Sequence, residues 1–232
     1  MLILNLKRRL YIIKVSKKYV RNWPSLLILS LLKKNGNFKS RQGGELIDVP
    51  ARYLLRSIVS IHSRNSNYKI KILFLNDAVK VELSNGFSII LNPTLPYPPV
   101  CDFDGIDKEY NIVNVRGKVV LDIGAYIGDS VLYWLWRGAK LVIAVEPVPE
   151  HYELLLRNTK DQPVIALNGS VGCDTPLIPQ LIGSHSYGIK EKPTQRNDYI
   201  KVPRYSLTEL IREYNPDIIK IDCEGCEQLY LR

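Results

Sequence analysis

The feature that most constrains the fold is an alternation of short apolar runs with single helical segments in the second half of the chain. The runs have the length and the β-branched content of buried strands. One helix is expected over 129–138, where Gly138 ends it, and another over 149–160, where Pro149 suits the first turn. Strands that alternate with single helices at this spacing form a parallel sheet with right-handed crossovers. The three runs are VVLDI (119–123), LVIAV (141–145) and PVIAL (163–167).

One further helix and strand are predicted closer to the end of the chain. The sequence Ser206-Leu207-Thr208-Glu209 is a capping box that begins a helix, and Asn215-Pro216 ends it. The run DIIKID (217–222) is then a fourth buried strand. About fifty residues separate the third strand from the fourth, which is more than a simple crossover needs. We therefore expect extra hairpin strands, or a loop over the site, within residues 175–204.

The sequence divides into three parts. Residues 1–36 form a basic segment that is expected to be helical, with a break at Pro24 and an end at Gly36. Residues 37–110 indicate a small α+β region with hairpins. The alternating pattern described above fills a third domain, residues 111–232.

The α+β region begins with a helical pattern and continues with strand patterns. Residues 50–63 have helical spacing, and three runs of β-type residues follow. The pair Asn85-Gly86 between the last two runs predicts a hairpin turn. The runs are KIKILFL, VKVEL and FSIIL, and the proline-rich connector LNPTLPYPPV comes after them.

The positive charge of the protein is concentrated at its start. The chain has a formal net charge of +9, but residues 1–44 hold 11 Lys and Arg and no acidic residue. The rest of the chain therefore carries a net charge of about −2. This distribution argues against a specific nucleic-acid binder. The basic segment is expected to cap the domain or to contact an anionic membrane surface.

Cysteine content and hydropathy restrict the compartment. Four cysteines scattered through 232 residues do not have the pattern of a disulfide framework, so a reducing interior is expected. No stretch reaches the roughly eighteen apolar residues of a membrane span. The longest candidate, SLLILSLL (25–32), is short and is bounded by Lys33. The expected location is cytoplasmic, at most peripheral to a membrane.

A spaced pair of glycines follows the first strand of the parallel sheet. In such sheets a ligand lies beyond the carboxyl ends of the strands, against the backbone of this turn. The turn reads Asp122-x-Gly124-x-x-x-Gly128, and Glu146 ends the next strand eighteen residues later. An acid at that position accepts hydrogen bonds from both hydroxyls of a ribose. The pair of features predicts an adenosine site.

The spacing of the glycines indicates which adenosine cofactor is bound. A dinucleotide favours Gly-x-Gly-x-x-Gly and a helix start without acids, because its pyrophosphate lies on the helix N-terminus. Here the middle glycine is absent and Asp129 stands at the helix start. A carboxylate there repels a pyrophosphate and accepts from an amino group. S-adenosylmethionine therefore suits the turn better than NAD.

Four stretches follow one another in the second half of the chain: VVLDIGAYIGDS, VIAVEPVPEHYELLLRN, the YSLTELI helix after VPR, and IIKIDCEGCE. In these stretches and their order the chain resembles, over about residues 108–232, the FkbM-like family of S-adenosylmethionine-dependent methyltransferases. The resemblance implies an α/β fold with a Rossmann-like parallel sheet of the class I methyltransferase type and an N-terminal α+β extension. The sheet is expected to be incomplete, because the chain stops at Arg232 where this fold needs three more strands. The sequence is therefore expected to be a fragment of a longer gene product, or to cover the open sheet edge with a partner, by self-association with a second copy, or with its own N-terminal hairpins.

The resemblance also implies which residues form the cofactor site. Tyr126 stands where many members of the family have Asn, and it would stack over the cofactor entrance or face solvent. The other residues are Asp122, Gly124, Ala125 and Gly128 near the methionine, Asp129 and Ser130 at the helix start, Glu146 and Pro147 at the ribose, and Asn168, Gly169, Ser170 and Val171 around the adenine.

Two carboxylates are candidates for the chemical step. Asp222 and Glu224 follow the fourth strand, where either could act as the general base or both could hold a divalent metal. The alternative is that Asp222 caps the next helix and Glu224 is solvated. His185 is a second candidate base, and Cys223 and Cys226 are more consistent with small buried residues than with a zinc site.

The expected function is O-methylation of a hydroxyl, on a sugar, a glycan or a secondary metabolite, as the resemblance implies. The acceptor is thus a small molecule or a glycan. Two alternatives remain open: a truncated relic that binds an adenosine cofactor without catalysis, and a nucleotide-dependent Rossmann oxidoreductase or epimerase. The missing glycine, and the lack of a Tyr-x-x-x-Lys pair after the fourth strand, argue against the latter.

Overall fold

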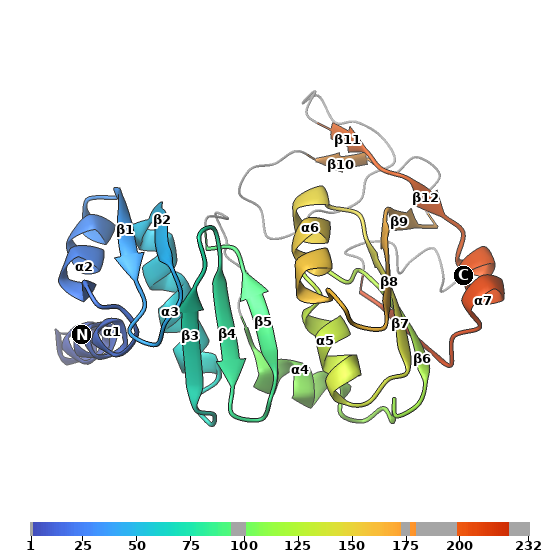
Figure 1. Cartoon of the computed structure of the whole chain (residues 1–232), viewed down its shortest axis with the longest axis horizontal. Helices are drawn as coiled ribbons and strands as arrows, with labels where there is room; N and C mark the ends of the chain where they lie inside the picture. The colour runs from blue at the N-terminus through green and yellow to red at the C-terminus, as the bar shows by residue number, and fades with distance from the viewer. Residues whose placement is uncertain (1, 94–100, 173–176, 180–198, 223–232) are drawn as a thin grey trace. The chain divides into compact units, whose positions relative to one another are not determined.

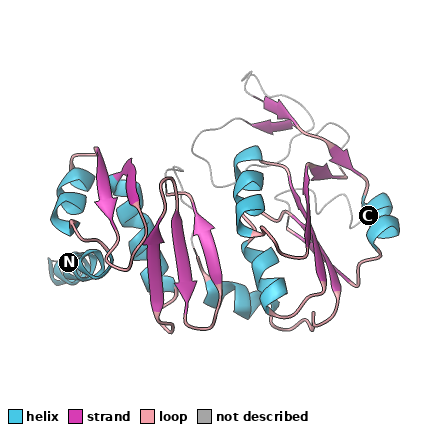
Figure 2. Cartoon of the chain, in the orientation of Figure 1, coloured by secondary structure: helices cyan, strands magenta, loops and turns pink. Residues whose placement is uncertain are grey.

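The computed structural model describes residues 2–93, 101–172, 177–179 and 199–222 (Figure 1). The chain divides into two compact units, Met1–Lys108 and Glu109–Arg232. Each unit contains both helices and strands (Figure 2). No helix among the described residues is both long enough and apolar enough to cross a bilayer.

The N-terminal unit combines helices with two antiparallel sheets. One sheet pairs β1 with β2, and the other has the order β3-β4-β5. Helices α1 and α2 pack against α3. The elements are α1 (Leu2–Tyr19), α2 (Trp23–Leu31), β1 (Asn35–Lys39), β2 (Leu46–Pro50), α3 (Ala51–Arg64), β3 (Ile70–Phe74), β4 (Val79–Leu83) and β5 (Ser88–Leu91), followed by α4 (Phe103–Tyr110).

The basic N-terminal segment is helical, but it does not end as expected. Pro24 stands in the first turn of α2, where its missing N–H costs nothing, and the break lies just before it. Gly36 does not end a helix; it lies within β1. A Cβ at Gly36 would lie 2.5 Å from Cδ1 of Leu29, so a glycine lets this strand approach α2 closely. The hairpin of β1 and β2 was not predicted.

The structure joins the first two sequence segments in one unit. Strand β1 crosses position 36, at which the basic segment was expected to end, and pairs with β2 over five residue pairs. From α1, Val15 and Tyr19 are fully buried. The hydroxyl of Tyr19 lies 2.9 Å from Nδ1 of His62 in α3. The basic segment therefore contributes to the core of the N-terminal unit.

The hairpin predicted at Asn85-Gly86 is confirmed. It joins β4 to β5, which pair in antiparallel register. Gly86 has a φ of +88°, which a side chain would strain, and its N–H donates to the carbonyl of Leu83 at 3.0 Å. The helix expected over residues 50–63 is also present, as α3.

The C-terminal unit is built around a parallel sheet. All four strands run parallel in the order β13-β6-β7-β8. In chain order this is the 3-2-1-4 arrangement of a Rossmann-like sheet, so the expected α/β fold class is confirmed. The elements are β6 (Val119–Ile123), α5 (Asp129–Trp136), β7 (Leu141–Glu146), α6 (Pro149–Asn158), β8 (Val164–Asn168), β9 (Ser170–Val171), β10 (Leu177–Pro179), β11 (Tyr199–Lys201), β12 (Arg204–Tyr205), α7 (Leu207–Tyr214) and β13 (Ile218–Ile221).

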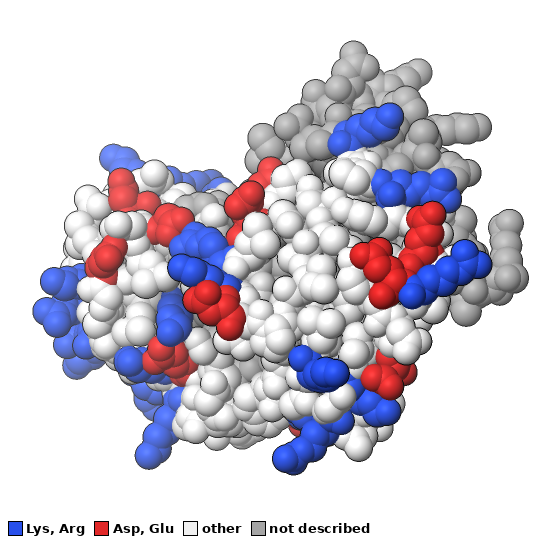
Figure 3. Space-filling view, turned by 45° about the vertical axis from the view of Figure 1, so that its right-hand side comes forward, with Lys and Arg blue, Asp and Glu red and all other residues white. Residues whose placement is uncertain are grey.

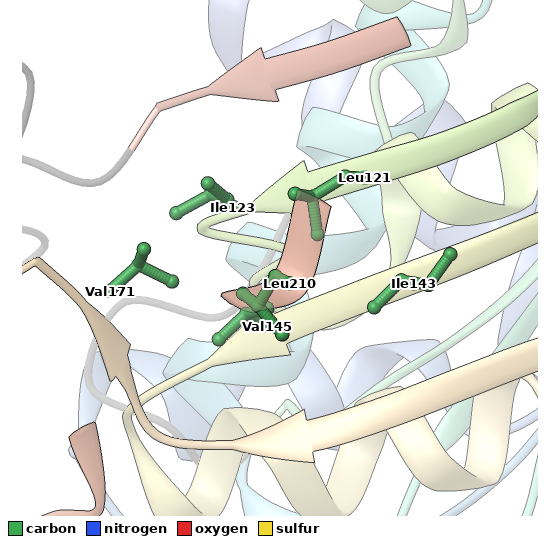
Figure 4. Close-up of a cluster of buried hydrophobic side chains, with 6 residues drawn as sticks. All are labelled: Leu121, Ile123, Ile143, Val145, Val171 and Leu210. Atoms are coloured by element: carbon green, nitrogen blue, oxygen red, sulfur yellow. The ribbon is translucent and has the colours of Figure 1, made fainter. Parts of the chain in front are cut away.

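Alternate residues of these strands face opposite layers of helices. Helices α5 and α6 cover one face of the sheet (Figure 1). On the other face, apolar side chains from β6, β7 and β9 meet Leu210 of α7 (Figure 4). Because side chains alternate along a strand, the residues between the members of this cluster point toward α5 and α6. The cluster comprises Leu121, Ile123, Ile143, Val145, Val171 and Leu210.

The long connection before β13 holds the extra strands that its length predicts. Strands β10 and β11 form an antiparallel pair, and β12 pairs in parallel with β9. The capping box is present, since Oγ of Ser206 accepts from the N–H of Glu209 at 3.4 Å. Asn215 ends α7 in the left-handed conformation.

Candidate functional site

The acidic and polar residues that end the strands of the parallel sheet meet at one edge. Glu146 and Asn168 are the last residues of β7 and β8 and are register partners. Asp122 is next to last in β6, and Asp222 follows β13 directly. Since the strands are parallel, their carboxyl ends share this edge, where such sheets bind ligands. The structure therefore brings together the side chains that the sequence pattern selects at these four positions.

The turn after β6 is tightly held by the protein's own backbone. The N–H groups of Gly124 and Ala125 both donate to the carbonyl of Val145, at 2.9 and 3.0 Å. Gly128 has a φ of +89°, and a Cβ there would lie 2.9 Å from Cδ1 of Leu155 in α6. This glycine thus permits close packing of the turn against a helix, which is one of the known uses of glycine in such turns.

Glu146 connects this turn to the one after β7. Its Oε2 accepts from the N–H of Tyr126 at 2.8 Å, and its Oε1 accepts from the N–H of Val148 at 2.9 Å. The residue is 4% exposed, and Oε1 lies 3.4 Å from Nδ1 of His151. An ionised carboxylate has about four acceptor positions, so both oxygens retain capacity for further hydrogen bonds.

Tyr126 and His151 form a small aromatic contact beside Glu146. Tyr126 has a positive φ of +51°, which is uncommon for a residue with a side chain. Its ring packs edge-on against the imidazole of His151, with centroids 4.4 Å apart. The tyrosine is half-buried. The sequence did not indicate this contact, because a histidine inside a helical pattern gives no signal of it.

Asp122 lies inside the structure rather than at its surface. It is fully buried, and its Oδ2 accepts from Oγ of Ser130 at 2.7 Å and from Nε1 of Trp134 at 3.0 Å. Its Oδ1 accepts no hydrogen bond of regular geometry among the described residues, but it lies 3.0 Å from Nζ of Lys220. In this arrangement Asp122 holds two side chains of α5, those of Ser130 and Trp134.

Lys220 is the partner that the sequence analysis did not identify. Its side chain is 10% exposed. It stands directly beside Asp122 in the parallel register of β13 and β6, so both side chains point to the α5 face. Its Nζ also donates to the carbonyl of Gly124 at 2.7 Å. Burial alone would lower the pKa of this lysine, but the charge of Asp122 raises it above its usual value. The sequence signal that could have identified Lys220 was a charged residue within the apolar run DIIKID.

Asp129 and Ser130, at the start of α5, lie beside the charged cluster of Asp122 and Lys220. Burial raises the pKa of Asp129 from 3.8 to about 6, although the charge of Lys220 and a hydrogen bond from the N–H of Ser130 oppose the shift. That N–H lies 3.0 Å from Oδ1 of Asp129. The first turn of α5 therefore already binds a carboxylate of the protein itself.

The adenine side was expected to involve residues around the end of β8. Nδ2 of Asn168 donates to the carbonyl of Glu146 at 2.9 Å and more weakly to that of Pro147 at 3.4 Å. These bonds fix the turn after β7 against the end of β8. Asn168 and Pro147 are both partly accessible at the edge of the sheet.

The next three residues are packed under β12. A Cβ at Gly169 would lie 2.6 Å from the ring of Tyr205, so glycine is needed for β12 to pair with β9. Val171 is 1% exposed and belongs to the cluster of Figure 4. Ser170 is 2% exposed, and its Oγ has no hydrogen-bond partner among the described residues.

Asp222 is the accessible carboxylate of the edge. Its side chain is 63% exposed, with Oδ2 3.8 Å from Nζ of Lys220. Its N–H donates to the carbonyl of Ile123 at 3.0 Å, which fixes the backbone at the end of β13. Within the described ranges, no group of three or more His, Cys, Asp or Glu side chains is arranged to hold a metal ion. The predictions for Glu224, His185, Cys223 and Cys226 lie outside the described residues.

Tyr110, at the end of α4, is a further neighbour of this cluster. Its ring lies 4.8 Å, centroid to centroid, from that of Trp134. Burial raises the pKa of its hydroxyl above 10.0, although the charge of Lys220 opposes the shift. The proline-rich sequence before α4 gave no indication of this helix, so the sequence analysis missed Tyr110.

Comparisons with known proteins bear on the same part of the chain. Residues 122–231 match the family model of the methyltransferase FkbM domain. Curated proteins gave no match. One similar solved structure, from Pyrococcus horikoshii, is described provisionally as an RNA methyltransferase; it aligns with 28% identity and a TM-score of 0.28, over 30% of this chain and 38% of that chain.

A second similar structure is Trm5b from Pyrococcus abyssi. It aligns with 17% identity and a TM-score of 0.32, over 69% of this chain and 56% of that chain. The present chain therefore spans less than two thirds of either structure. The match of residues 122–231, within the C-terminal unit, to the FkbM methyltransferase domain confirms the family resemblance seen in the sequence.

Proposed function

We propose that the C-terminal unit is an S-adenosylmethionine-dependent methyltransferase that methylates a hydroxyl group of a sugar, a glycan or a secondary metabolite. The match of residues 122–231 to the methyltransferase FkbM domain supports the reaction class. The cysteine pattern of the sequence is consistent with a cytoplasmic location.

The choice of cofactor rests on one observation at the start of α5. A dinucleotide places its pyrophosphate on the free N–H groups of this helix end. Here Oδ1 of Asp129 accepts from the N–H of Ser130 at 3.0 Å, so a negative charge of the protein already occupies that position. A second anion there would be repelled. The cationic amino group of S-adenosylmethionine is instead attracted by Asp129.

The residues at the sheet edge fit the remaining parts of this cofactor. Glu146 would hold the ribose hydroxyls, since its oxygens keep acceptor capacity beyond the bonds from Tyr126 and Val148. Oγ of Ser170 lacks a partner within the described part of the chain and would suit a polar atom of the adenine. When bound, the cofactor supplies a methyl group that its sulfonium activates.

The protein's own part in catalysis is alignment and removal of a proton. Methyl transfer to oxygen needs an acceptor hydroxyl held in line, with a base to take its proton. Asp222 is exposed at the same edge, with the positive charge of Lys220 3.8 Å away. We assign it as the general base, with Glu224 as the second carboxylate of the motif. If the two instead hold a divalent metal, the metal would polarise the acceptor oxygen.

Calorimetric titration of the full chain with S-adenosylmethionine, S-adenosylhomocysteine and NAD tests the cofactor. The proposal expects the first two to bind and NAD not to bind. Binding of NAD alone would favour the oxidoreductase alternative. Binding of S-adenosylmethionine without methylated product, across a panel of sugars, glycans and small hydroxylated molecules, would favour a binding module.

The role of Asp222 is tested by Asp222→Asn. Turnover should fall by roughly 10² or more, with affinity for S-adenosylhomocysteine nearly unchanged. Asp161→Asn is a matched control, because Asp161 is an exposed acid of the same unit away from this edge, and Asn tolerates its φ of +61°. Full activity of Asp222→Asn would remove this residue from the mechanism.

A further inference from the structure

Helix α2 carries an exposed apolar face. Ile28, Leu31 and Leu32 are 56%, 85% and 58% exposed. Leu31 and Leu32 follow Ile28 by three and four residues, so all three lie on one side of the helix. Pro24, one turn before Ile28, is exposed on the same side. This α2 face, defined by these four residues, is a contiguous apolar surface.

The α2 face stays exposed although the opposite side of the helix packs against the rest of the unit. The helix sequence WPSLLILSL is apolar on nearly every side, which is the composition of a helix surrounded by partners. Within the described residues, however, only one side is covered: Leu26 is fully buried, and α2 packs against α1, α3 and β1. Large exposed apolar patches on soluble proteins usually mark interaction sites.

Basic side chains surround this face and acidic ones are absent from the segment. Arg21 lies before the helix, and Lys33 and Lys34 follow it directly; all three are exposed. Residues 1–44 contain 11 Lys and Arg and no acid. On the molecular face drawn in Figure 3, acidic and basic side chains both occur, so the absence of acids is a property of this segment and not of the whole surface.

Helix α1 extends the same combination of residues. Leu6 and Leu10 are 58% and 57% exposed and lie four residues apart, with the exposed bases Lys7, Arg8 and Arg9 between them. Apolar and basic side chains alternate around this part of the helix. Both N-terminal helices therefore combine exposed aliphatic groups with positive charge.

We propose that the α2 face, with Arg21, Lys33 and Lys34, docks on an anionic lipid membrane. Aliphatic side chains insert into the boundary between headgroups and acyl chains, while the neighbouring bases attract anionic headgroups. A single-stranded nucleic acid would instead need aromatic side chains on which bases stack, and the α2 face has none. The surface would hold the methyltransferase unit near acceptors at a membrane.

Sedimentation of the full chain with lipid vesicles tests the proposal. The vesicles consist of phosphatidylcholine alone or with about 30% phosphatidylglycerol, a lipid with one negative charge. Binding is expected only to the mixed vesicles, and it should weaken as salt is raised from about 0.05 M to about 0.5 M, because salt screens the attraction. Equal binding to both kinds of vesicle, or to neither, would overturn the proposal.

Two pairs of variants assign the binding to this surface. Leu31→Ser should weaken binding to the mixed vesicles by roughly threefold or more, and Lys33→Glu with Lys34→Glu by roughly tenfold or more. Ile112→Ser is the matched apolar control, since Ile112 is also 85% exposed but lies in the other unit. The matched charge control is Lys140→Glu with Lys160→Glu, which makes the same change of charge in the C-terminal unit.

The outcomes of these variants are decisive. Weaker binding of the α2 variants alone supports the proposal, and equal effects in both units would show nonspecific attraction and contradict it. Tighter binding to RNA of about twenty nucleotides than to the mixed vesicles would also overturn it. A wild type that forms dimers which Leu31→Ser abolishes, without vesicle binding, would assign the face to a second copy. Circular dichroism checks that each variant remains folded.

Discussion

The two units place their opposite charges in different environments. In the C-terminal unit, Asp122 and Lys220 form an ion pair with side chains 0% and 10% exposed. In the N-terminal unit, Glu82 of β4 pairs with Lys71 of the neighbouring β3 and with Lys80 of its own strand, and these three side chains are between 30% and 52% exposed. The distances are similar, from 2.8 to 3.0 Å, so these pairs differ in burial and not in contact geometry.

This difference in burial indicates a different role for the exposed pairs of Glu82 and for the buried Asp122–Lys220 pair. Exposed ion pairs contribute little to stability, because water and salt screen them. A buried pair costs desolvation, which its attraction does not always repay, so it is weak evidence for stability on its own. The Asp122–Lys220 pair also binds the carbonyl of Gly124, Oγ of Ser130 and Nε1 of Trp134. Its effect is to fix the turn at the candidate cofactor site.

The largest effect is expected from removing one charge of the buried pair. Lys220→Met leaves the carboxylate of Asp122 buried without its cation, which should cost about 3–5 kcal/mol of unfolding free energy. Urea unfolding measures this in a Trp23→Phe background. There the fluorescence comes from Trp134 and Trp136, both in the C-terminal unit.

The matched control replaces both members of the pair. Asp122→Asn combined with Lys220→Met removes both charges and keeps an amide oxygen that can accept from Ser130 and Trp134, so it should be less destabilising than Lys220→Met alone. A double variant that is as unstable as the sum of the two single variants would show that the pair is not coupled. The comparison between the two units would then fail.

The next effect concerns the close packing of the turn. Gly128→Ala should cost roughly 2–3 kcal/mol, because it combines a strained φ of +89° with a Cβ 2.9 Å from Leu155. Gly117→Ala, at a φ of +72° with no heavy atom within 4 Å of the new Cβ, should cost only about 1 kcal/mol. The same urea assay compares them. Equal costs would mean that contact with α6 does not explain Gly128.

A smaller, pH-dependent effect is expected at Asp129. Burial raises its pKa from 3.8 to about 6, so the folded state binds the proton more tightly than the unfolded state. Stability should therefore fall as the pH rises through this window. The variant Asp129→Asn does not titrate, so it does not lose this stability. Between pH 4 and pH 7 its free energy of unfolding should rise by about 1 kcal/mol relative to that of the wild type, a figure that allows for the partial exposure of the Asp129 side chain. Parallel stability curves of the two proteins over this range would refute the assignment.

The smallest effect is expected at the exposed pairs. Hydrogen bonds from Lys80 and Lys71 lower the pKa of Glu82, so its contribution is present at neutral pH and is lost as the pH falls below about 4.5. Glu82→Gln should nevertheless cost less than about 1 kcal/mol at neutral pH. Urea unfolding followed by circular dichroism measures it. A cost equal to that of Lys220→Met would show that burial does not separate the two units.

The parallel sheet could be predicted because its signals are local. The apolar runs that became β6, β7, β8 and β13 are short and β-branched, and glycines or prolines bound the helices between them. Glu146 could be selected in the same way, since the end of the second strand is defined by its own sequence. The ligand contacts expected of these residues remain predictions.

The features that were missed depend on distant residues. Lys220 and Asp122 are 98 positions apart, and only the register of β13 beside β6 makes them neighbours. Strand β1, NGNFK, has Phe38 as its only large apolar side chain, and its glycine gave the signal of a helix end. Tyr110 lies on a helix of eight residues after a proline-rich segment. Local propensity cannot supply information that arises from tertiary pairing.

The account depends most on Glu146 as the carboxylate that holds the cofactor ribose. Its most direct test is calorimetric titration of S-adenosylhomocysteine into the wild type, Glu146→Gln and the control Glu150→Gln. The control changes an exposed acid in the first turn of α6. We predict that Glu146→Gln binds roughly 5 to 150 times more weakly, or about 1–3 kcal/mol, while Glu150→Gln binds like the wild type. Wild-type affinity in a folded Glu146→Gln variant would contradict the account.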